Sequence, residues 1–358
     1  MNGEFLVPTG WVIKEYIECQ NMSQKEFSFR LGVSEKHVSN LLKGKTRLTE
    51  EMALKIETIL TPTPASYWLN YESKYQEYIA RQKFSEVYSA KDLKIYANRF
   101  HFKEVFSGLN WDMEKQAKEM LKILRIARFE NFYAAYNEFV NVNFMEDGGE
   151  KEAIAIWLGL AREEIEVQNK KEIAEKTFKK ENLEQDLYIL KNIALNEDYI
   201  DSIRSARKFL NFLGVYLVIC EPVINCKVRG ALTSYEGIPT IFISGRFKTH
   251  DNVWFALIHE IAHLLMHYDS DRTIISFEDS QEKMAVEEKE ANLFSRAFFI
   301  NEQNYKEFIG KYSNTFSDKL IKDFAITQNV LPGVVVGRMQ HDKVIPFDKF
   351  NHLKKSVE

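Results

Sequence analysis

The stretch from Trp254 to His267 constrains this chain more than any other. It is an apolar run with helical spacing, and His259 and His263 stand four residues apart within it. Residues four apart lie one turn above each other on the same face of a helix, so two imidazoles can point at one metal ion. Glu260 lies beside them, in the position of a general base rather than a ligand. The alternative is a buried helix whose histidines are hydrogen-bonded in the core.

A zinc site needs a third protein ligand and a fourth position open to water. Apolar residues recur at helical spacing through 287–299, which predicts a second helix that packs beside the first. Glu288 at its start suits a ligating carboxylate, with the Asn292 amide one turn behind it as a supporting group. Glu287 and Glu290 stay open as rivals, because spacing alone does not separate three carboxylates in four positions. A solvated acidic face is the alternative for all three.

The residues from 22 to 45 predict a different structure, a helix-turn-helix. Ser23 caps a short helix, Glu26 stands at the matching capping-box position, and Gly32 ends the helix. Ser34 then caps a second helix of similar length. Two short helices joined by a glycine turn are typical of a unit whose second helix enters the major groove of DNA.

Charge supports this interpretation. Between residues 23 and 47 there are six basic and two acidic side chains, in a chain whose net charge is −4. A local basic excess is the footprint expected for phosphate binding, although a three-helix bundle with a solvated basic face is the alternative. The residues expected to contact DNA are Gln24, Lys36, His37, Ser39, Asn40 and Lys43.

The middle of the chain, 87–200, predicts helices over 112–124, 151–175 and 181–193. Aromatic residues are dense from Phe129 to Phe144, where we expect core packing, with a sensory pocket as the alternative. Further on, strands are predicted over 214–219 and over a second segment that runs from 229 to 244.

Composition places the chain among cytoplasmic proteins with no membrane segment. No apolar run approaches the 18 residues that a membrane helix needs, and the first ten residues lack the basic start and apolar core of a signal peptide. The three cysteines lack the spacing of a metal finger, so we expect buried thiols.

Two resemblances join these observations. His259–His263, the following 264–267 and the later 288–294 resemble the ImmA/IrrE-type zinc metallopeptidases, a likeness that extends over roughly 200–345. The resemblance implies Zn²⁺ held by His259, His263 and Glu288, with Glu260 as the general base on water and a strand edge that holds a peptide in extended form. One departure is Asn301, where a proline is expected.

The amino-terminal segment, about 9–78, resembles the helix-turn-helix of HigA-type antitoxins in the lambda-repressor-like (XRE-type) class. Proteins of this kind commonly bind as homodimers to two-fold operators. We therefore expect a mainly α fold with a small β-sheet (α+β). Its parts are a helix-turn-helix domain over 1–86, a helical linker or sensor over 87–200, and a zincin-like metallopeptidase domain over 201–358.

Together the resemblances imply a transcriptional regulator that binds a double-stranded DNA operator and carries a zinc metalloendopeptidase, whose substrate is a repressor or an antitoxin. Whether that peptidase is latent until a partner arrives stays open. The alternative is an antitoxin-like autorepressor with a toxin partner, whose second domain only binds or senses that partner. A stress activator that relieves repression elsewhere is a third interpretation.

Overall fold

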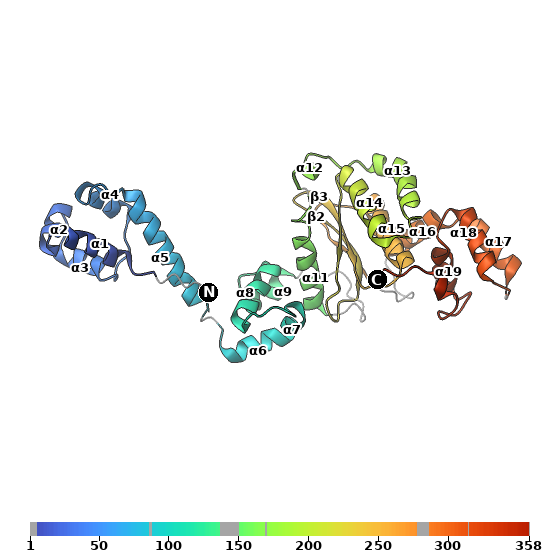
Figure 1. Cartoon of the computed structure of the whole chain (residues 1–358), viewed down its shortest axis with the longest axis horizontal. Coiled ribbons are helices and arrows are strands. Elements are labelled where there is room, and N and C mark those ends of the chain that lie inside the picture. The colour runs from blue at the N-terminus through green and yellow to red at the C-terminus, as the bar shows by residue number, and fades with distance from the viewer. Residues whose placement is uncertain are drawn as a thin grey trace. The chain divides into compact units, whose positions relative to one another are not determined.

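The computed structural model of the chain describes residues 6–85, 88–136, 150–168, 170–277, 286–313 and 315–357 (Figure 1). They fall into two compact units, Met1–Leu93 and Lys94–Glu358. The first unit is helical and the second adds a four-stranded sheet to its helices, which confirms the mainly α fold with a small sheet. The finer division at residues 86 and 200 stays a prediction.

The amino-terminal unit is a helical bundle around one apolar core. Phe27, Val38 and Trp68 are fully buried at its centre. Both predicted caps are present, because Ser23 Oγ accepts the Glu26 N–H at 3.1 Å and Ser34 Oγ accepts the His37 N–H at 3.3 Å. Five helices make up the unit: α1 (Thr9–Cys19), α2 (Gln24–Leu31), α3 (Glu35–Leu42), α4 (Glu50–Ile59) and α5 (Ala65–Ser85).

Two glycines set the position of α3 within this bundle. Gly32 has a φ of +68°, the left-handed conformation that ends α2 as the sequence predicts. Gly10 on α1 lies directly against the carboxyl end of α3, where a Cβ would stand only 1.7 Å from the Leu41 carbonyl oxygen. One side of α3 is therefore fixed by close packing, which leaves its other side facing outward.

In the second unit the predicted aromatic core is present. Phe129 and Phe132 are buried and pack against Phe100, the first with its ring tilted and the second edge-to-face, at centroid distances of 5.0 and 5.2 Å. Tyr133 is exposed instead, and Phe139 and Phe144 lie outside the described residues. The helices of this part are α6 (Ala90–Arg99), which spans the boundary between the units, α7 (Phe102–Val105), α8 (Met113–Ile123), η1 (Phe129–Asn131), α9 (Phe132–Ala135), α11 (Lys151–Glu163), α12 (Lys170–Ala174), α13 (Lys180–Ile193) and α14 (Tyr199–Phe212).

The sheet has the strand order β1-β3-β2-β4. β1 is parallel to β3, and the other neighbours are antiparallel. The second strand that the sequence predicts is in fact a hairpin, because Glu236 and Gly237 both adopt positive φ and turn the chain between β2 and β3. Its strands are β1 (Tyr216–Cys220), β2 (Val228–Tyr235), β3 (Ile238–Ser244) and β4 (Ile274–Phe277).

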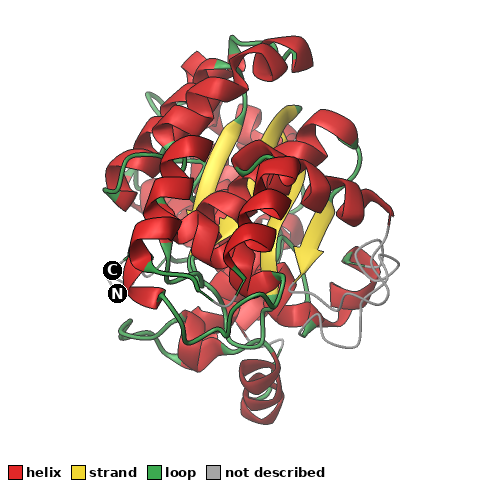
Figure 2. Ribbon diagram, turned by 90° about the vertical axis from the view of Figure 1, so that its right-hand side faces the viewer, coloured by secondary structure: helices red, strands yellow, loops and turns green. Residues whose placement is uncertain are grey.

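Helices cover both faces of this sheet, as Figures 1 and 2 show. On one face, Trp157 of α11 packs edge-on against Phe242 at 6.2 Å and donates its indole N–H to the Cys220 carbonyl at 3.2 Å. On the other face lie α14 and α15, the helix that carries the histidine pair. The helices that complete this side are α15 (His250–Met266), α16 (Val286–Phe299), α17 (Glu302–Tyr312), α18 (Asp318–Gln328), α19 (Pro332–His341) and η2 (Asn351–Leu353).

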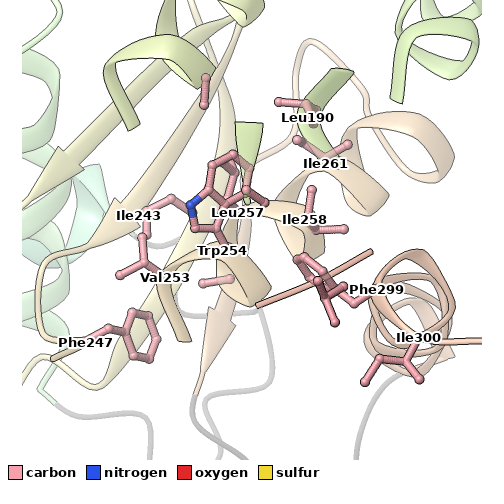
Figure 3. Packing of buried hydrophobic residues seen from close by; sticks show 14 of the residues in the cluster. Leu190, Ile243, Phe247, Val253, Trp254, Leu257, Ile258, Ile261, Phe299 and Ile300 are labelled. Carbon is pink, nitrogen blue, oxygen red and sulfur yellow. The ribbon is translucent and has the colours of Figure 1, made fainter. Parts of the chain in front are cut away.

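The α15 helix is buried over nearly its whole length. Trp254, Leu257 and Ile258 are fully buried, between Ile243 of the sheet and Phe299 at the end of α16 (Figure 3). Apolar packing on this scale holds α15 in one position against both the sheet and α16. Among the described residues, no helix has the length and apolar character needed to span a membrane.

Candidate metal centre and nucleic-acid interface

Three side chains from α15 and α16 converge on one point. The His259 and His263 Nε2 atoms lie 3.1 Å apart. Glu288 reaches both, with Oε2 at 3.2 Å from His259 Nε2 and Oε1 at 3.0 Å from His263 Nε2. All three potential ligand atoms lie within 4.8 Å of one another. Two imidazoles and one carboxylate form a donor set that suits a zinc ion with one position left open.

The two rival carboxylates point to other partners. The two carboxylate oxygens of Glu287 accept hydrogen bonds from Nη1 and Nη2 of Arg272, at 2.8 and 2.6 Å. Glu290 Oε2 lies 2.9 Å from His267 Nε2. Of the three glutamates that spacing could not separate, Glu288 is therefore the one that meets the histidine pair. Burial favours the protonated form of Glu288, but its hydrogen bonds with the two histidines outweigh this and hold its pKa well below the ordinary value.

The outer nitrogens of both histidines are also engaged. His259 Nδ1 lies 3.1 Å from Asn292 Oδ1, the amide expected to support the site. A donor Nδ1–H there leaves the Nε2 lone pair directed at the centre. Burial lowers the pKa of His259, which favours the neutral imidazole that a metal requires.

His263 is held by a longer chain of contacts. Its Nδ1 lies 3.0 Å from His267 Nδ1, and His267 Nε2 lies 2.9 Å from Glu290. If the His267 Nε2–H is donated to Glu290, His267 Nδ1 accepts the His263 Nδ1–H, and the His263 Nε2 lone pair also faces the centre. His267 directly follows the last residue of α15. The signal that could have indicated this contact is its spacing of four residues from His263.

Glu260 directly follows His259 on α15 and is fully buried. Within the described part of the chain, neither of its carboxylate oxygens makes a hydrogen bond of ordinary geometry, although the Ser276 hydroxyl lies near enough to oppose the rise of its pKa. Gly230 of β2 lies against it so closely that a Cβ there would stand 2.5 Å from Oε1. Burial raises the pKa of Glu260 well above its ordinary value. A buried carboxylate without an ordinary hydrogen bond is expected where a bound group completes the site.

In the other unit, all the residues predicted to contact DNA lie at the surface. Val38, Leu41 and Leu42 form the buried side of α3. Lys36, His37 and Lys43 are exposed, Ser39 and Asn40 are half-buried, and Gln24 is exposed at the start of α2. This arrangement leaves the polar side of α3 available to a groove; the individual contacts stay predictions.

Comparison with known proteins identifies both units. Residues 217–331 match a peptidase family model described as the IrrE N-terminal-like domain, and residues 13–68 match a helix-turn-helix model. A similar protein is the uncharacterized HTH-type transcriptional regulator YddM of Escherichia coli (strain K12). It is 33% identical over 66 residues, which are 18% of this chain and 69% of the relative.

A helix-turn-helix domain joined to a metallopeptidase-type domain defines the class of protein, a DNA-binding regulator with a peptidase-like unit. The chain belongs to the helix-turn-helix family and carries an IrrE-like domain, as both resemblances implied.

Proposed function

We propose that this protein is a DNA-binding transcriptional regulator and a zinc-dependent endopeptidase that cuts a specific regulatory protein, a repressor or an antitoxin. The observation that carries the proposal is the meeting of His259, His263 and Glu288 beside a buried Glu260 whose carboxylate makes no hydrogen bond of ordinary geometry among the described residues. A merely structural histidine pair would not need such a carboxylate next to it.

Each residue of the site has its own role in the proposed reaction. Zn²⁺, when bound by the two histidines and Glu288, supplies a Lewis acid that polarises a scissile carbonyl. The positive charge of a bound Zn²⁺ would favour the ionised form of Glu260, whose carboxylate would take a proton from the attacking water and pass it to the leaving amine. Asn292 and His267 orient the two imidazoles through their Nδ1 atoms.

The sheet offers a place for the substrate beside this site. β4 is one of the two end strands of the described sheet, and Ser276 in β4 pairs with Gly230, the residue that lies against Glu260. An extended peptide that adds to the outer edge of β4 would run past Glu260, with its backbone held by strand pairing. Such recognition selects an extended or unfolded segment of the target.

The amino-terminal unit would bring this activity to an operator. We assign Gln24, Lys36, His37, Ser39, Asn40 and Lys43 to DNA contact, and a homodimer to a two-fold operator site. Of these, Lys36 and Lys43 would contact the phosphates, because lysine provides a point charge, and Asn40 would hydrogen-bond to a base edge. An antitoxin-like autorepressor with a toxin partner is the second candidate, favoured by the likeness to HigA-type helix-turn-helix domains.

The test compares the wild type with Glu260→Gln in the host cell by mass spectrometry of new protein amino termini. We expect one or a few new termini, in a transcriptional regulator or antitoxin, with the wild type alone. Glu307→Gln, at an exposed glutamate of α17 away from the metal centre, provides the matched glutamate control and should retain cleavage. Identical termini with the wild type and Glu260→Gln would contradict the peptidase and leave the autorepressor as the better interpretation.

A further inference from the structure

A cavity of about 220 Å³ lies beyond the metal centre, where α15 and α16 continue side by side. Phe255 of α15 lines it, one helical turn before His259. Phe299 of α16 lines it as well, two turns after Asn292, the residue that contacts His259. The cavity contains none of the residues assigned above to the metal centre, and nothing in the proposed function uses it.

The two helices run in opposite directions past the metal centre, which fixes the place of the cavity relative to it. At the carboxyl end of α15, His267 contacts Glu290 near the start of α16. Further along the pair, His259 contacts Asn292, and the cavity follows next in the same order. One helical turn advances about 5.4 Å. The cavity therefore begins roughly one turn beyond His259.

The strand β2 also joins the cavity to the metal centre. Arg229 lines the cavity, with its guanidinium carbon 5.1 Å from the centroid of the Phe255 ring, and the next residue, Gly230, lies against Glu260. Consecutive side chains of a regular strand point to opposite faces. The pairing of β2 with β4 is irregular between Val228 and Gly230, however, and such a bulge re-aims a side chain. One short segment of β2 thus borders both places.

Charged side chains of the lining pair with other groups of the protein. Lys354 Nζ lies 3.1 Å from Asp251 Oδ2. Asp342, behind the lining, pairs with Arg338 at 2.5 Å and with Arg296 at 3.8 Å. A charged occupant would have to compete with these pairs, and breaking a buried pair is costly. The lining therefore favours an uncharged occupant.

The walls of the cavity offer apolar surface to such an occupant. Phe255, Phe299, Ile300 and Val334 form these walls. All four belong to the core around α15 or pack against it, and Figure 3 shows Phe299 and Ile300 within that core. Phe347, which is 71% exposed, also lines the cavity and would be covered by an occupant. Walls held by a close-packed core keep their shape before an occupant arrives.

We propose that this cavity is the specificity pocket of the peptidase, and that it takes one large apolar side chain of the substrate, within two residues of the bond to be cut. The inference rests on the proposed function, because it needs a polypeptide at the metal centre. Sites for drug-sized ligands measure about 300–1,000 Å³. A cavity of about 220 Å³ is smaller and suits a single side chain.

The path of a peptide along β4 leads toward this cavity. Ser276 pairs with Gly230 beside Glu260, and the next residue, Phe277, pairs with Val228. The cavity-lining residue of β2 lies between these two pairs. Side chains two residues apart in an extended chain lie on one face, about 6.6 Å from each other. That spacing is close to the one helical turn that separates the cavity from the metal ligands, so one peptide can reach both.

The test measures the binding of two hydroxamates to the full-length protein supplied with zinc, by calorimetry. The hydroxamate group of each binds zinc; 3-phenylpropanohydroxamate carries a phenyl group where succinamohydroxamate carries a carboxamide. We expect the phenyl compound to bind at least about tenfold more tightly, since an aromatic group gains free energy on burial. Val334→Trp should remove this preference, because the indole fills the cavity, and should leave zinc content and succinamohydroxamate binding unchanged. Val167→Trp, at an exposed valine outside the lining, is the matched control.

A second variant covers the case in which Val334→Trp proves unfolded by thermal denaturation. Asn252→Trp places the indole at an exposed position of the lining and should remove the same preference. Equal binding of the two hydroxamates to the wild type, or a phenyl preference that survives in the folded variants, would overturn the pocket and leave the metal centre in place. Binding of neither hydroxamate to the wild type supplied with zinc would overturn the proposed function, and this inference with it.

Discussion

The helix-turn-helix and the candidate metal centre are both built on pairs of helices, but their polar side chains lie in opposite environments. On α3, Lys36 and His37 are exposed, as expected for side chains whose partner is another molecule. On α15, His259 and His263 are fully buried, and each must find its partners inside the fold. A surface site needs only a well-formed local scaffold, whereas a buried site needs distant segments to meet with atomic accuracy.

The two units also differ in how far along the chain their parts lie. The helix-turn-helix is complete within about 25 residues, with its caps and its glycine turn adjacent in sequence. The metal centre joins α15, α16 and β2, and its supporting contacts run from Asn292 to His259 and from Glu290 through His267 to His263. Damage to one unit should therefore leave the other intact, which the following experiments test.

The largest effect is expected from Gly10→Ala. The new Cβ would stand 1.7 Å from the Leu41 carbonyl oxygen, so α1 must move off α3. We expect a loss of about 3 kcal/mol in the stability of the amino-terminal unit, seen as faster hydrogen exchange in 9–60 and lost DNA binding, with zinc content unchanged. Gly310→Ala, where a Cβ meets nothing within 4 Å, is the matched control. An equal loss of stability in both units, with zinc content also lost, would show that the two units do not fold independently.

The metal centre should be sensitive to a residue that does not touch the metal. His267→Ala removes the partner of His263 Nδ1, so the imidazole loses its fixed orientation. We expect zinc affinity to fall about 10–100-fold, measured by competition with a fluorescent chelator, with DNA binding unaffected. His352→Ala, at an exposed histidine paired with Asp318, should change neither property. Unchanged zinc affinity in His267→Ala would show that the contact between His267 and His263 does not support the metal site.

A smaller effect is expected at the local caps of the helix-turn-helix. Ser34→Ala removes the acceptor for the His37 N–H and should cost about 1 kcal/mol in the free energy of unfolding of that unit. Ser34→Asn keeps a side-chain acceptor and should restore most of the loss. Denaturant unfolding followed by hydrogen exchange measures both. Failure of the asparagine to restore stability would argue against capping as the cause.

The smallest change is expected for single basic residues on the exposed side of α3. Lys36→Ala should weaken DNA binding about equally for all sequences and lower the slope of log affinity against log salt by about 0.9, the value for one phosphate contact. Titrations with duplex DNA at several salt concentrations measure this. Lys306→Ala, an exposed lysine of the second unit, is the control. An unchanged slope in Lys36→Ala would place this lysine away from the phosphates.

The contrast between the units also explains what the sequence could predict. Ser23, Gly32 and Ser34 indicated both helices of the helix-turn-helix, because capping and turn formation act over three or four residues. The pair His259 and His263 was likewise visible as a local spacing. These features need no knowledge of how distant segments pack.

The parts that stayed open or were misread depend on long-range packing. Choosing Glu288 over Glu287 and Glu290 required the position of α16 beside α15, and Arg272 and His267 occupy the other two carboxylates only in the folded chain. β4 is four residues long, too short for a clear alternating pattern. The β2–β3 hairpin was read as one strand because the strand-forming residues continue on both sides of a two-residue turn.

We infer that α15 and α16 together form a zinc site with Glu288 as its third ligand. The most direct measurement is zinc per chain by elemental analysis after dialysis against metal-free buffer. We expect about one zinc ion per chain in the wild type and in Glu287→Gln, and none in His263→Ala or Glu288→Gln. A folded wild type that stays empty when zinc is supplied would contradict the zinc site, and a Glu288→Gln variant that keeps its zinc would contradict Glu288 as a ligand.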